Sequence, residues 1–432
     1  MTFYYAIRYF TALAVPMIIS NIFTPLVGLV DTAIVGHLPG THFLAGVALG
    51  GIIITQLIWV CGFLRMSSTG LSAQASGRDN SEEAASILNN GILLALLLGV
   101  LIWLLSPVLF QLGEYFSGSN PQVVSVAQAY FYIRVFAAPV SLANLVLMGW
   151  LLGRKQHSKV MWIQLIANLL NIVLSLLLAI GLSMHVTGVA LATVISECVI
   201  LVLSLLWIAK IFPQWRHHIC LCQNKVKAFL SLNRDVFLRN VFLQLFLAIF
   251  TFMGLQLGEL TAATNALLMQ FFVLIALGLD GVAYAAEALF GEAIGKQQRH
   301  RARQWTHISL LVSTAFAVLY TGIFWGFFYE ISQLLTNLTT VIQNLQAFKV
   351  YIVLLPLIAH WSFLLDGLYV GMTRAKPMFV TMVISVVLAI CWQLLHLDAM
   401  SATVLWQSFM IFLLARGLLL GTHFYYRIYR PS

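Results

Sequence analysis

Asp31 is the residue whose surroundings most strongly suggest chemistry. It is the only charged residue between Ala12 and Gly36, in an apolar stretch that also contains Pro16 and Pro25. An ionised carboxylate in hydrocarbon is expensive, so a chain seldom keeps one there without a use. Each proline removes a backbone donor and favours a bend. We therefore expect a proton-binding carboxyl group at Asp31, in a helix with a hinge at Pro25; a structural carboxylate, hydrogen-bonded to a neighbouring helix, is the alternative.

A second set of polar residues repeats at helical spacing later in the first half. The positions i, i+4, i+7 and i+11 of one apolar stretch carry Gln164, Asn168, Asn171 and Ser175. This spacing places all four on one helix face. Amides in a membrane helix can line a cavity, and they can equally hold neighbouring helices together. The stripe predicts a polar cavity or a polar helix contact.

The second half of the chain has its own buried polar candidates. They fall in two apolar stretches and comprise Asp280, Tyr284, Glu287 and Asp366. The first three share one helix face, because they are spaced i, i+4 and i+7. These groups could bind a cationic drug or a second ion. They could also be structural, with Arg416 or Lys349 as the partners of the acids.

Motifs for catalysis are absent from the sequence. There is no G-x-x-x-x-G-K-[ST] phosphate loop, and the five cysteines follow no disulfide or zinc pattern. We therefore expect no enzyme activity, no cofactor and no resident metal. The ion expected at Asp31 is H⁺, with Na⁺ as an alternative.

The composition defines the class of protein. Of 432 residues, 61% are hydrophobic and only 9% are charged, whereas about a quarter of a soluble domain is charged. The chain is therefore predicted to be an all-α polytopic membrane protein. Its net charge of +9 fits cytoplasmic loops rich in Lys and Arg better than nucleic-acid binding.

Cutting the sequence at charges and turn residues gives about twelve membrane spans. They lie near 10–35, 43–66, 87–110, 122–152, 159–182, 187–210, 235–256, 262–291, 304–328, 343–372, 377–397 and 400–426. Alternate connecting loops carry Lys and Arg, and the others carry acids without Lys or Arg. This alternation predicts that both termini are cytoplasmic, which an even number of spans also requires.

An internal repeat divides the chain. At a shift of 218 residues Gly149 aligns with Gly367, and Gly153 with Gly371. The shift carries six spans, an even number, so both halves keep the same orientation. We expect two parallel six-helix lobes, residues 1–211 and 232–432, joined by a cytoplasmic linker at 212–231 and enclosing a central cleft.

Five sequence runs resemble the multidrug and toxic compound extrusion (MATE) family, in particular its DNA-damage-inducible protein F (DinF) branch. The runs are VDTAIVGHL, FLRMSSTGLSAQASG, YFYIRVFAAP, LDGVAYAAEALFGEAIG and LLDGLYVGMTR. The resemblance implies two six-helix bundles in a V, alternating access, and efflux of organic compounds against an inward cation flow.

The same resemblance assigns roles to individual residues. It implies that Asp31 is the coupling residue and that Asn171 and Ser175 lie in the cavity of the N-terminal lobe. Residues 171–175 read NIVLS where relatives often have NIVLD, so a neutral serine replaces a second acid. This departure favours H⁺ over Na⁺ coupling.

The expected function is therefore proton-coupled efflux of organic, cationic or amphipathic compounds. The alternatives are Na⁺-coupled efflux, a lipid or lipid-linked precursor flippase of the same superfamily, and a membrane enzyme that uses Asp31 with Asp280 or Asp366. We expect a monomer in the bacterial cytoplasmic (inner) membrane, with membrane lipids and small molecules as partners and no nucleic acid.

Overall fold

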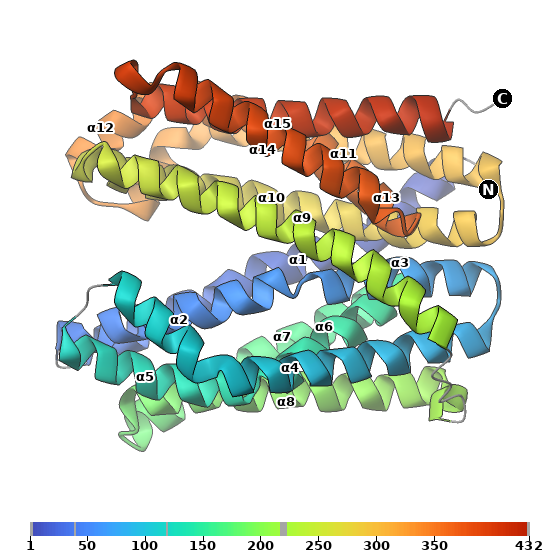
Figure 1. The fold of residues 1–432 in the computed structure, drawn as a ribbon, viewed down its shortest axis with the longest axis horizontal. Coiled ribbons are helices and arrows are strands. Elements are labelled where there is room, and N and C mark those ends of the chain that lie inside the picture. The colour runs from blue at the N-terminus through green and yellow to red at the C-terminus, as the bar shows by residue number, and fades with distance from the viewer. Residues whose placement is uncertain (1–2, 39, 118–119, 217–222, 430–432) are drawn as a thin grey trace. The chain divides into compact units, whose positions relative to one another are not determined.

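The computed structural model describes residues 3–38, 40–117, 120–216 and 223–429, and within them it contains helices and no strand. The chain divides into two compact units. The N-terminal unit is Ile19–Leu230, and the C-terminal unit combines Met1–Ile18 with Ser231–Ser432. Each unit is a bundle of long helices (Figure 1). Helices are expected here because, in lipid, every backbone polar group must be satisfied within its own segment.

The first helix, α1 (Phe3–Gly36), belongs to both units. The other elements of the N-terminal unit are α2 (Thr41–Val60), α3 (Phe63–Gly77), α4 (Ser81–Ser117), α5 (Pro121–Phe136), α6 (Ala138–Gly153), α7 (His157–Ser175), the π-helix η1 (Leu176–Gly181), α8 (His185–Ile211) and the 3₁₀-helix η2 (Pro213–Arg216).

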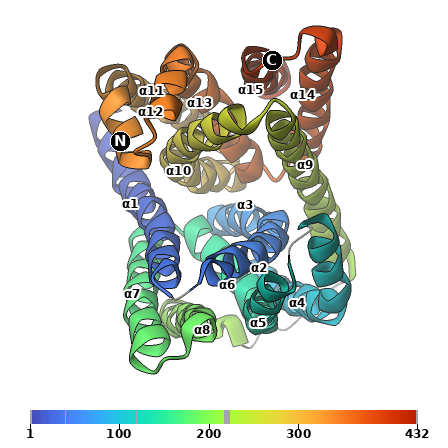
Figure 2. The same cartoon turned by 90° about the vertical axis from the view of Figure 1, so that its left-hand side faces the viewer.

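The C-terminal unit holds the rest of the chain (Figure 2). Its elements are α9 (Gln223–Gln256), α10 (Glu259–Gly295), α11 (Arg299–Leu335), α12 (Thr339–Ala347), α13 (Lys349–Gly371), α14 (Ala375–Leu395), the 3₁₀-helix η3 (Leu397–Ala399), α15 (Ala402–Phe424) and the π-helix η4 (Tyr425–Tyr429).

The expected number of spans is confirmed. Among the described residues, 11 helices are long and apolar enough to cross a membrane, or up to 12 if α5 and α6, which meet at a bend of 50°, form one broken span. The predicted class, an all-α polytopic membrane protein, is therefore correct.

The units differ from the predicted lobes at the start of the chain. The lobes of residues 1–211 and 232–432 stay a prediction; residues 3–18 cluster with the C-terminal unit. The reason is that α1 continues as one helix through Pro16 and Pro25, so its first half lies beside α10, where Gly281 leaves room for Ile18. Of the predicted linker 212–231, residues 217–222 lie outside the described residues.

Backbone conformation shows the internal repeat directly. Three pairs of residues have a positive φ and are each separated by 218 positions: Gly40 and Gly258, Asp79 and Gln297, and Lys155 and Thr373. Positive φ is rare for residues other than glycine. Its recurrence at one spacing shows that the two halves turn their chains in the same way at the same places.

Helix packing repeats with the same spacing. A Cβ atom at Gly149 would collide with the backbone of Arg65, and one at Gly367 would meet the backbone of Ala283, 218 residues further on. The helices α3 and α6 therefore approach as closely in the N-terminal unit as α10 and α13 do in the C-terminal unit. Small residues at such contacts let membrane helices pack through their backbones.

Gly371 should be sensitive to the smallest side chain. A Cβ there would lie 2.8 Å from the carbonyl oxygen of Glu287, so Gly371→Ala must push α13 away from α10. We expect a loss of about 1–3 kcal/mol, measured as a lower thermal unfolding midpoint in detergent. Gly322→Ala is the control, because a Cβ at Gly322 meets nothing within 4 Å. Equal midpoints for the two variants would contradict the close contact.

Candidate functional site

Asp31 lies in the last turns of α1 and is half-buried. Its Oδ1 accepts a hydrogen bond of 2.8 Å from the hydroxyl of Ser175. Ser175 is fully buried at the end of α7, where the helix widens into the π-helix η1. Widened turns of this kind occur frequently at functional sites. The structure thus brings together two residues that lie 144 positions apart.

The polar stripe of α7 faces the neighbouring helices. At one end Gln164 accepts a hydrogen bond from the buried hydroxyl of Ser20 on α1. Further along, the amide of Asn171 donates to Thr193 on α8 at 3.1 Å. The Nδ2 group of Asn168, between them, is buried without a hydrogen-bond partner in the described part of the chain. The stripe therefore joins α7 to both α1 and α8.

These contacts connect the stripe to the carboxyl group. The hydroxyl of Ser175 lies 3.5 Å from Oδ1 of Asn171 as well as 2.8 Å from Asp31. Asp31, Ser175, Asn171 and Thr193 thus form a short chain of polar side chains across α1, α7 and α8. Sequence reasoning missed Thr193, although its position four residues before Glu197 on α8 marks a shared polar face.

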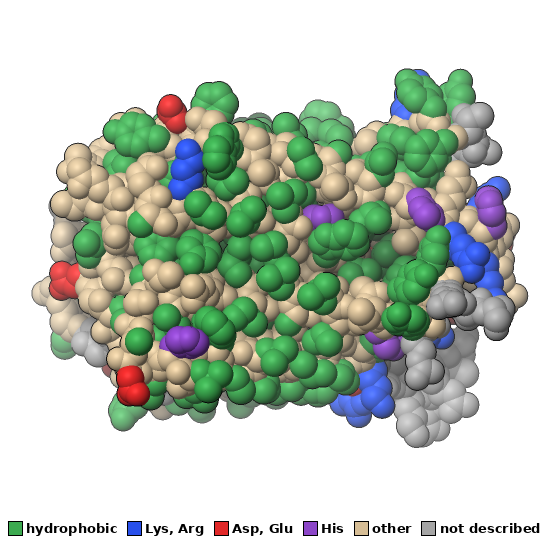
Figure 3. Space-filling view, turned by 90° about the horizontal axis from the view of Figure 1, so that it is seen from above, with side chains coloured by type: hydrophobic (Ala, Val, Ile, Leu, Met, Phe, Trp, Pro, Cys, Tyr) green, Lys and Arg blue, Asp and Glu red, His purple; other side chains and the backbone are tan. Residues whose placement is uncertain are grey.

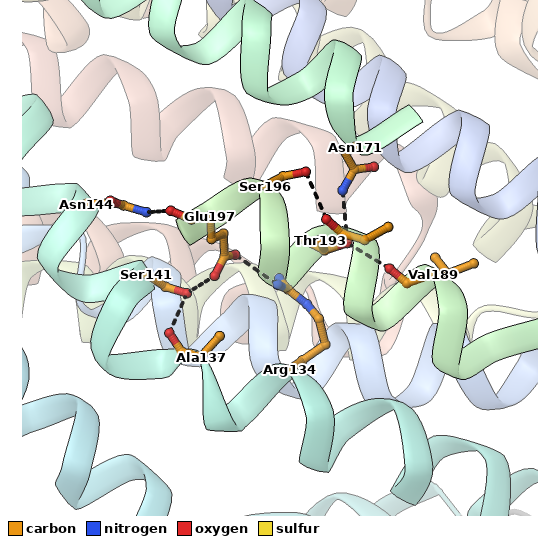
Figure 4. Close-up of polar contacts among 10 residues, drawn as sticks. Arg134, Ala137, Ser141, Asn144, Asn171, Val189, Thr193, Ser196 and Glu197 are labelled. Atoms are coloured by element: carbon orange, nitrogen blue, oxygen red, sulfur yellow. Dashed lines mark hydrogen bonds and ion pairs between the residues drawn. The ribbon is translucent and has the colours of Figure 1, made fainter. Parts of the chain in front are cut away.

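A buried ion pair lies in the same unit (Figure 4). Arg134 on α5 binds Glu197 on α8 with an N–O distance of 2.8 Å. Ser141 also donates to the Glu197 carboxylate, and the amide of Asn144 donates to the Glu197 carbonyl at 2.9 Å. The charge of Arg134 is therefore balanced by Glu197.

The pairing of Arg134 with Glu197 determines whether Arg134 can serve as a counter-charge for Asp31. Tyr130 lies on α5 with Arg134, and the charges of both Arg134 and Asp31 act on it. Arg134 is thus close enough to act on Asp31, but it is bound to Glu197. In the described ranges Asp31 forms no ion pair, and Ser175 is its one hydrogen-bond partner.

The acids of the C-terminal unit are arranged differently. Asp366 on α13 binds two arginines, Arg239 on α9 and Arg416 on α15, and all three side chains are buried. Of the partners that the sequence suggested, Arg416 is present and Lys349 is not, because its ammonium group lies over the ring of Trp325 at 5.4 Å. Sequence reasoning missed Arg239.

The three candidates on α10 lie along one helix, as the spacing predicted. Asp280 and Tyr284 are half-buried and Glu287 is buried. The charge of Asp280 also acts on Arg239, so this acid belongs to the same electrostatic cluster as Asp366. Within the residues that the structure describes, no group of three or more His, Cys, Asp or Glu side chains could hold a metal ion.

The pairing of Asp366 predicts a stability effect. Asp366→Asn leaves two buried guanidinium groups without their shared carboxylate, and breaking a buried pair costs about 3–5 kcal/mol. We expect a clearly lower thermal unfolding midpoint. The double variant Asp366→Asn, Arg416→Gln should recover part of the loss, because one uncompensated charge is removed. Unchanged stability together with lost transport would instead indicate that Asp366 binds a ligand.

The fold and the site define a polytopic membrane protein made of two repeated helix bundles, with a half-buried acid in one of them. The MatE family model matches the chain twice, at residues 16–177 and 236–395. The chain belongs to the MatE family. The double match agrees with the repeat seen in the backbone.

Individual relatives support this assignment. The DNA damage-inducible protein F of Escherichia coli (strain K12) is 38% identical over 95% of this chain and 90% of its own length. The multidrug and toxin extrusion protein 1 of Danio rerio is 32% identical over 43% of this chain and 31% of its own length. A crystal structure of MATE in the bent conformation matches with a TM-score of 0.86 at 18% identity, covering 95% of this chain and 93% of that one.

Proposed function

We propose that this chain is a secondary multidrug efflux antiporter that exchanges organic, cationic or amphipathic compounds for H⁺. Relatives that carry the words multidrug and toxin extrusion, or multidrug resistance, in their names support the substrate class. The observation that carries the coupling proposal is the site of Asp31, a half-buried acid with one hydroxyl donor and no ion pair among the described residues.

Such a carboxyl group has two ways to meet its hydrogen-bonding needs. When ionised, it is an acceptor only and can use several donors, whereas the protonated form both donates and accepts. One hydroxyl at 2.8 Å satisfies only part of the ionised form. Either a proton or a positively charged substrate would compensate the negative charge that the single hydroxyl leaves unsatisfied. Competition between the two for one acid is the simplest basis for antiport.

The loose packing of α1 would allow this helix to move when Asp31 gains or loses a proton. In the described chain neither α1 nor α9, the first long helices of the two halves, forms an extensive close pairing with another helix. Large apolar side chains such as Ile22, Phe23 and Leu29 are exposed along α1. At Pro25 the backbone lacks a donor. Protonation of Asp31 would then let α1 repack by bending near Pro25, rearrange its contacts with the polar stripe of α7 and release substrate by alternating access.

The proton supplies enough free energy for this work. One proton moving inward yields about 2.3 kcal/mol per 100 mV of membrane potential, in addition to any pH gradient. Since about 1.4 kcal/mol corresponds to a factor of ten in an equilibrium, even one proton sustains a substantial concentration gradient of substrate.

The proposal includes a location and an orientation. The 38% identity to an Escherichia coli protein over most of the chain supports the bacterial inner membrane. Lys and Arg in alternate loops support cytoplasmic termini. We propose that the monomer is the working unit, since each chain contains both halves of the repeat.

The direct test is Asp31→Asn in proteoliposomes that carry an imposed pH gradient. We expect wild-type protein to move a fluorescent organic cation equally well in Na⁺ and choline buffers. The variant should transport at least about tenfold more slowly, because an amide can neither bind nor release the proton. Asp398→Asn, at an exposed position of the short 3₁₀-helix η3, is the matched control and should behave as wild type.

Three outcomes would overturn the proposal. Full transport by Asp31→Asn would remove the coupling role of this residue. Transport that requires Na⁺ and ignores the pH gradient would show Na⁺ coupling instead. Movement of fluorescent lipid in place of the organic cation would indicate the flippase alternative.

A further inference from the structure

A crevice opens on the C-terminal unit, and its lining includes none of the polar residues described above. It measures about 720 Å³ and lies between α11, α13 and α15, ending at η4. Leucines from α13 and α15 contribute to its walls, together with Trp361 of α13. Its size falls within the range of about 300–1,000 Å³ that is usual for small-molecule pockets.

Two glycines create the crevice. Gly417 and Gly421 lie one turn apart on α15 and both line the hollow. Without side chains there, α15 leaves an open space opposite α13. A Cβ at Gly421 would have only an ordinary contact, 3.6 Å from a methyl group of Leu365. A Cβ at Gly417 would lie 3.3 Å from the Cβ of Trp361, so Gly417 lets α15 approach α13, whereas the position of Gly421 has room for a side chain.

The end of the crevice has a different chemistry. His307 on α11 lies 2.7 Å from the hydroxyl of Tyr429, and the guanidinium of Arg303 donates to the Tyr429 carbonyl at 2.8 Å. Tyr425 and Tyr426 line the same end. Tyrosines with a polar tip are typical of the boundary between hydrocarbon and headgroups. The hollow is thus apolar along its length and polar, aromatic and basic at one end.

The basic character extends beyond the rim. The exposed residues Arg299 and Arg301 begin α11 beside Arg303, and the nearby Glu292 is paired with Lys296. In Figure 3 hydrophobic side chains cover much of this face, most Lys and Arg lie toward the end where α11 begins, and Asp and Glu lie mainly toward the other end, which also carries a Lys or Arg side chain. A negative group is therefore favoured at the polar end of the crevice.

The length of the hollow fits one lipid chain. Its lining along α13 extends from Leu357 to Leu368, about 16 Å at the helical rise of 1.5 Å per residue. One leaflet of the hydrocarbon core is about 15 Å thick. An acyl chain anchored by its headgroup at Arg303 would fill the crevice along its whole length.

We propose that this crevice binds an anionic glycerophospholipid, with an acyl chain between α13 and α15 and the phosphate at Arg303 and His307. Basic pockets between membrane helices are suited to such headgroups. An organic cation is disfavoured, because Arg303 repels it and no acid lines the crevice among the described residues. The site is separate from Asp31 and does not depend on the proposed transport.

Native mass spectrometry of the purified, delipidated protein tests the proposal. It would be titrated with phosphatidylglycerol or phosphatidylcholine carrying the same acyl chains. We expect one tightly retained phosphatidylglycerol per molecule. Gly421→Leu fills the hollow and should weaken its binding about tenfold. Gly322→Leu adds the same side chain at an open position of α11 and should bind as wild type.

A second variant separates the headgroup from the chain. Arg303→Gln should lower the preference for phosphatidylglycerol over phosphatidylcholine about fivefold, since one basic residue contributes about 1 kcal/mol. Phosphatidylcholine binding should stay unchanged, which would also show that this variant is folded. Equal binding of both lipids to wild-type protein, or one-for-one displacement of phosphatidylglycerol by ethidium, would overturn the proposal.

Discussion

A charge inside a membrane helix bundle needs a partner, and the polar architecture of this protein follows from that constraint. In the N-terminal unit Arg134 is bound by Glu197. In the C-terminal unit Asp366 is bound by two arginines. Asp31 differs, because within the described chain it has a hydroxyl donor from Ser175 and no counter-charge. Because Asp31 has no fixed cation beside it, we propose that it is available to a mobile cation, either a proton or a substrate.

The repeat makes this difference between the units informative. Turns with positive φ and the glycine contacts between helices recur 218 residues apart, so the scaffold was duplicated together with its packing. The buried acids were not duplicated. Asp31 corresponds to Ile249, and Asp366 corresponds to Met148. Scaffold features occur twice, whereas each buried acid occurs once. This fits different tasks for the two units: the proposed proton exchange in one, and a paired charge cluster in the other.

Hydropathy, loop charge and the repeat predicted the fold class and the spans, because apolar length and backbone satisfaction leave few options in a membrane. They could not predict that residues 3–18 pack with the C-terminal unit, since that depends on where a continuous helix runs in space. The resemblance placed Ser175 near Asp31, and the structure shows them in contact. Spacing alone could not choose between binding and pairing for Asp366, because its partner Arg239 lies 127 residues away.

The central claim is that a proton and a substrate compete for Asp31. It is tested most directly by adding a cationic substrate to purified protein in weakly buffered detergent and following the pH with an indicator dye. The account predicts release of about one proton per bound substrate, since competing ligands expel each other reciprocally, and no release from Asp31→Asn. Equal proton release by wild-type protein and Asp31→Asn, or substrate binding to wild-type protein without any release, would contradict it.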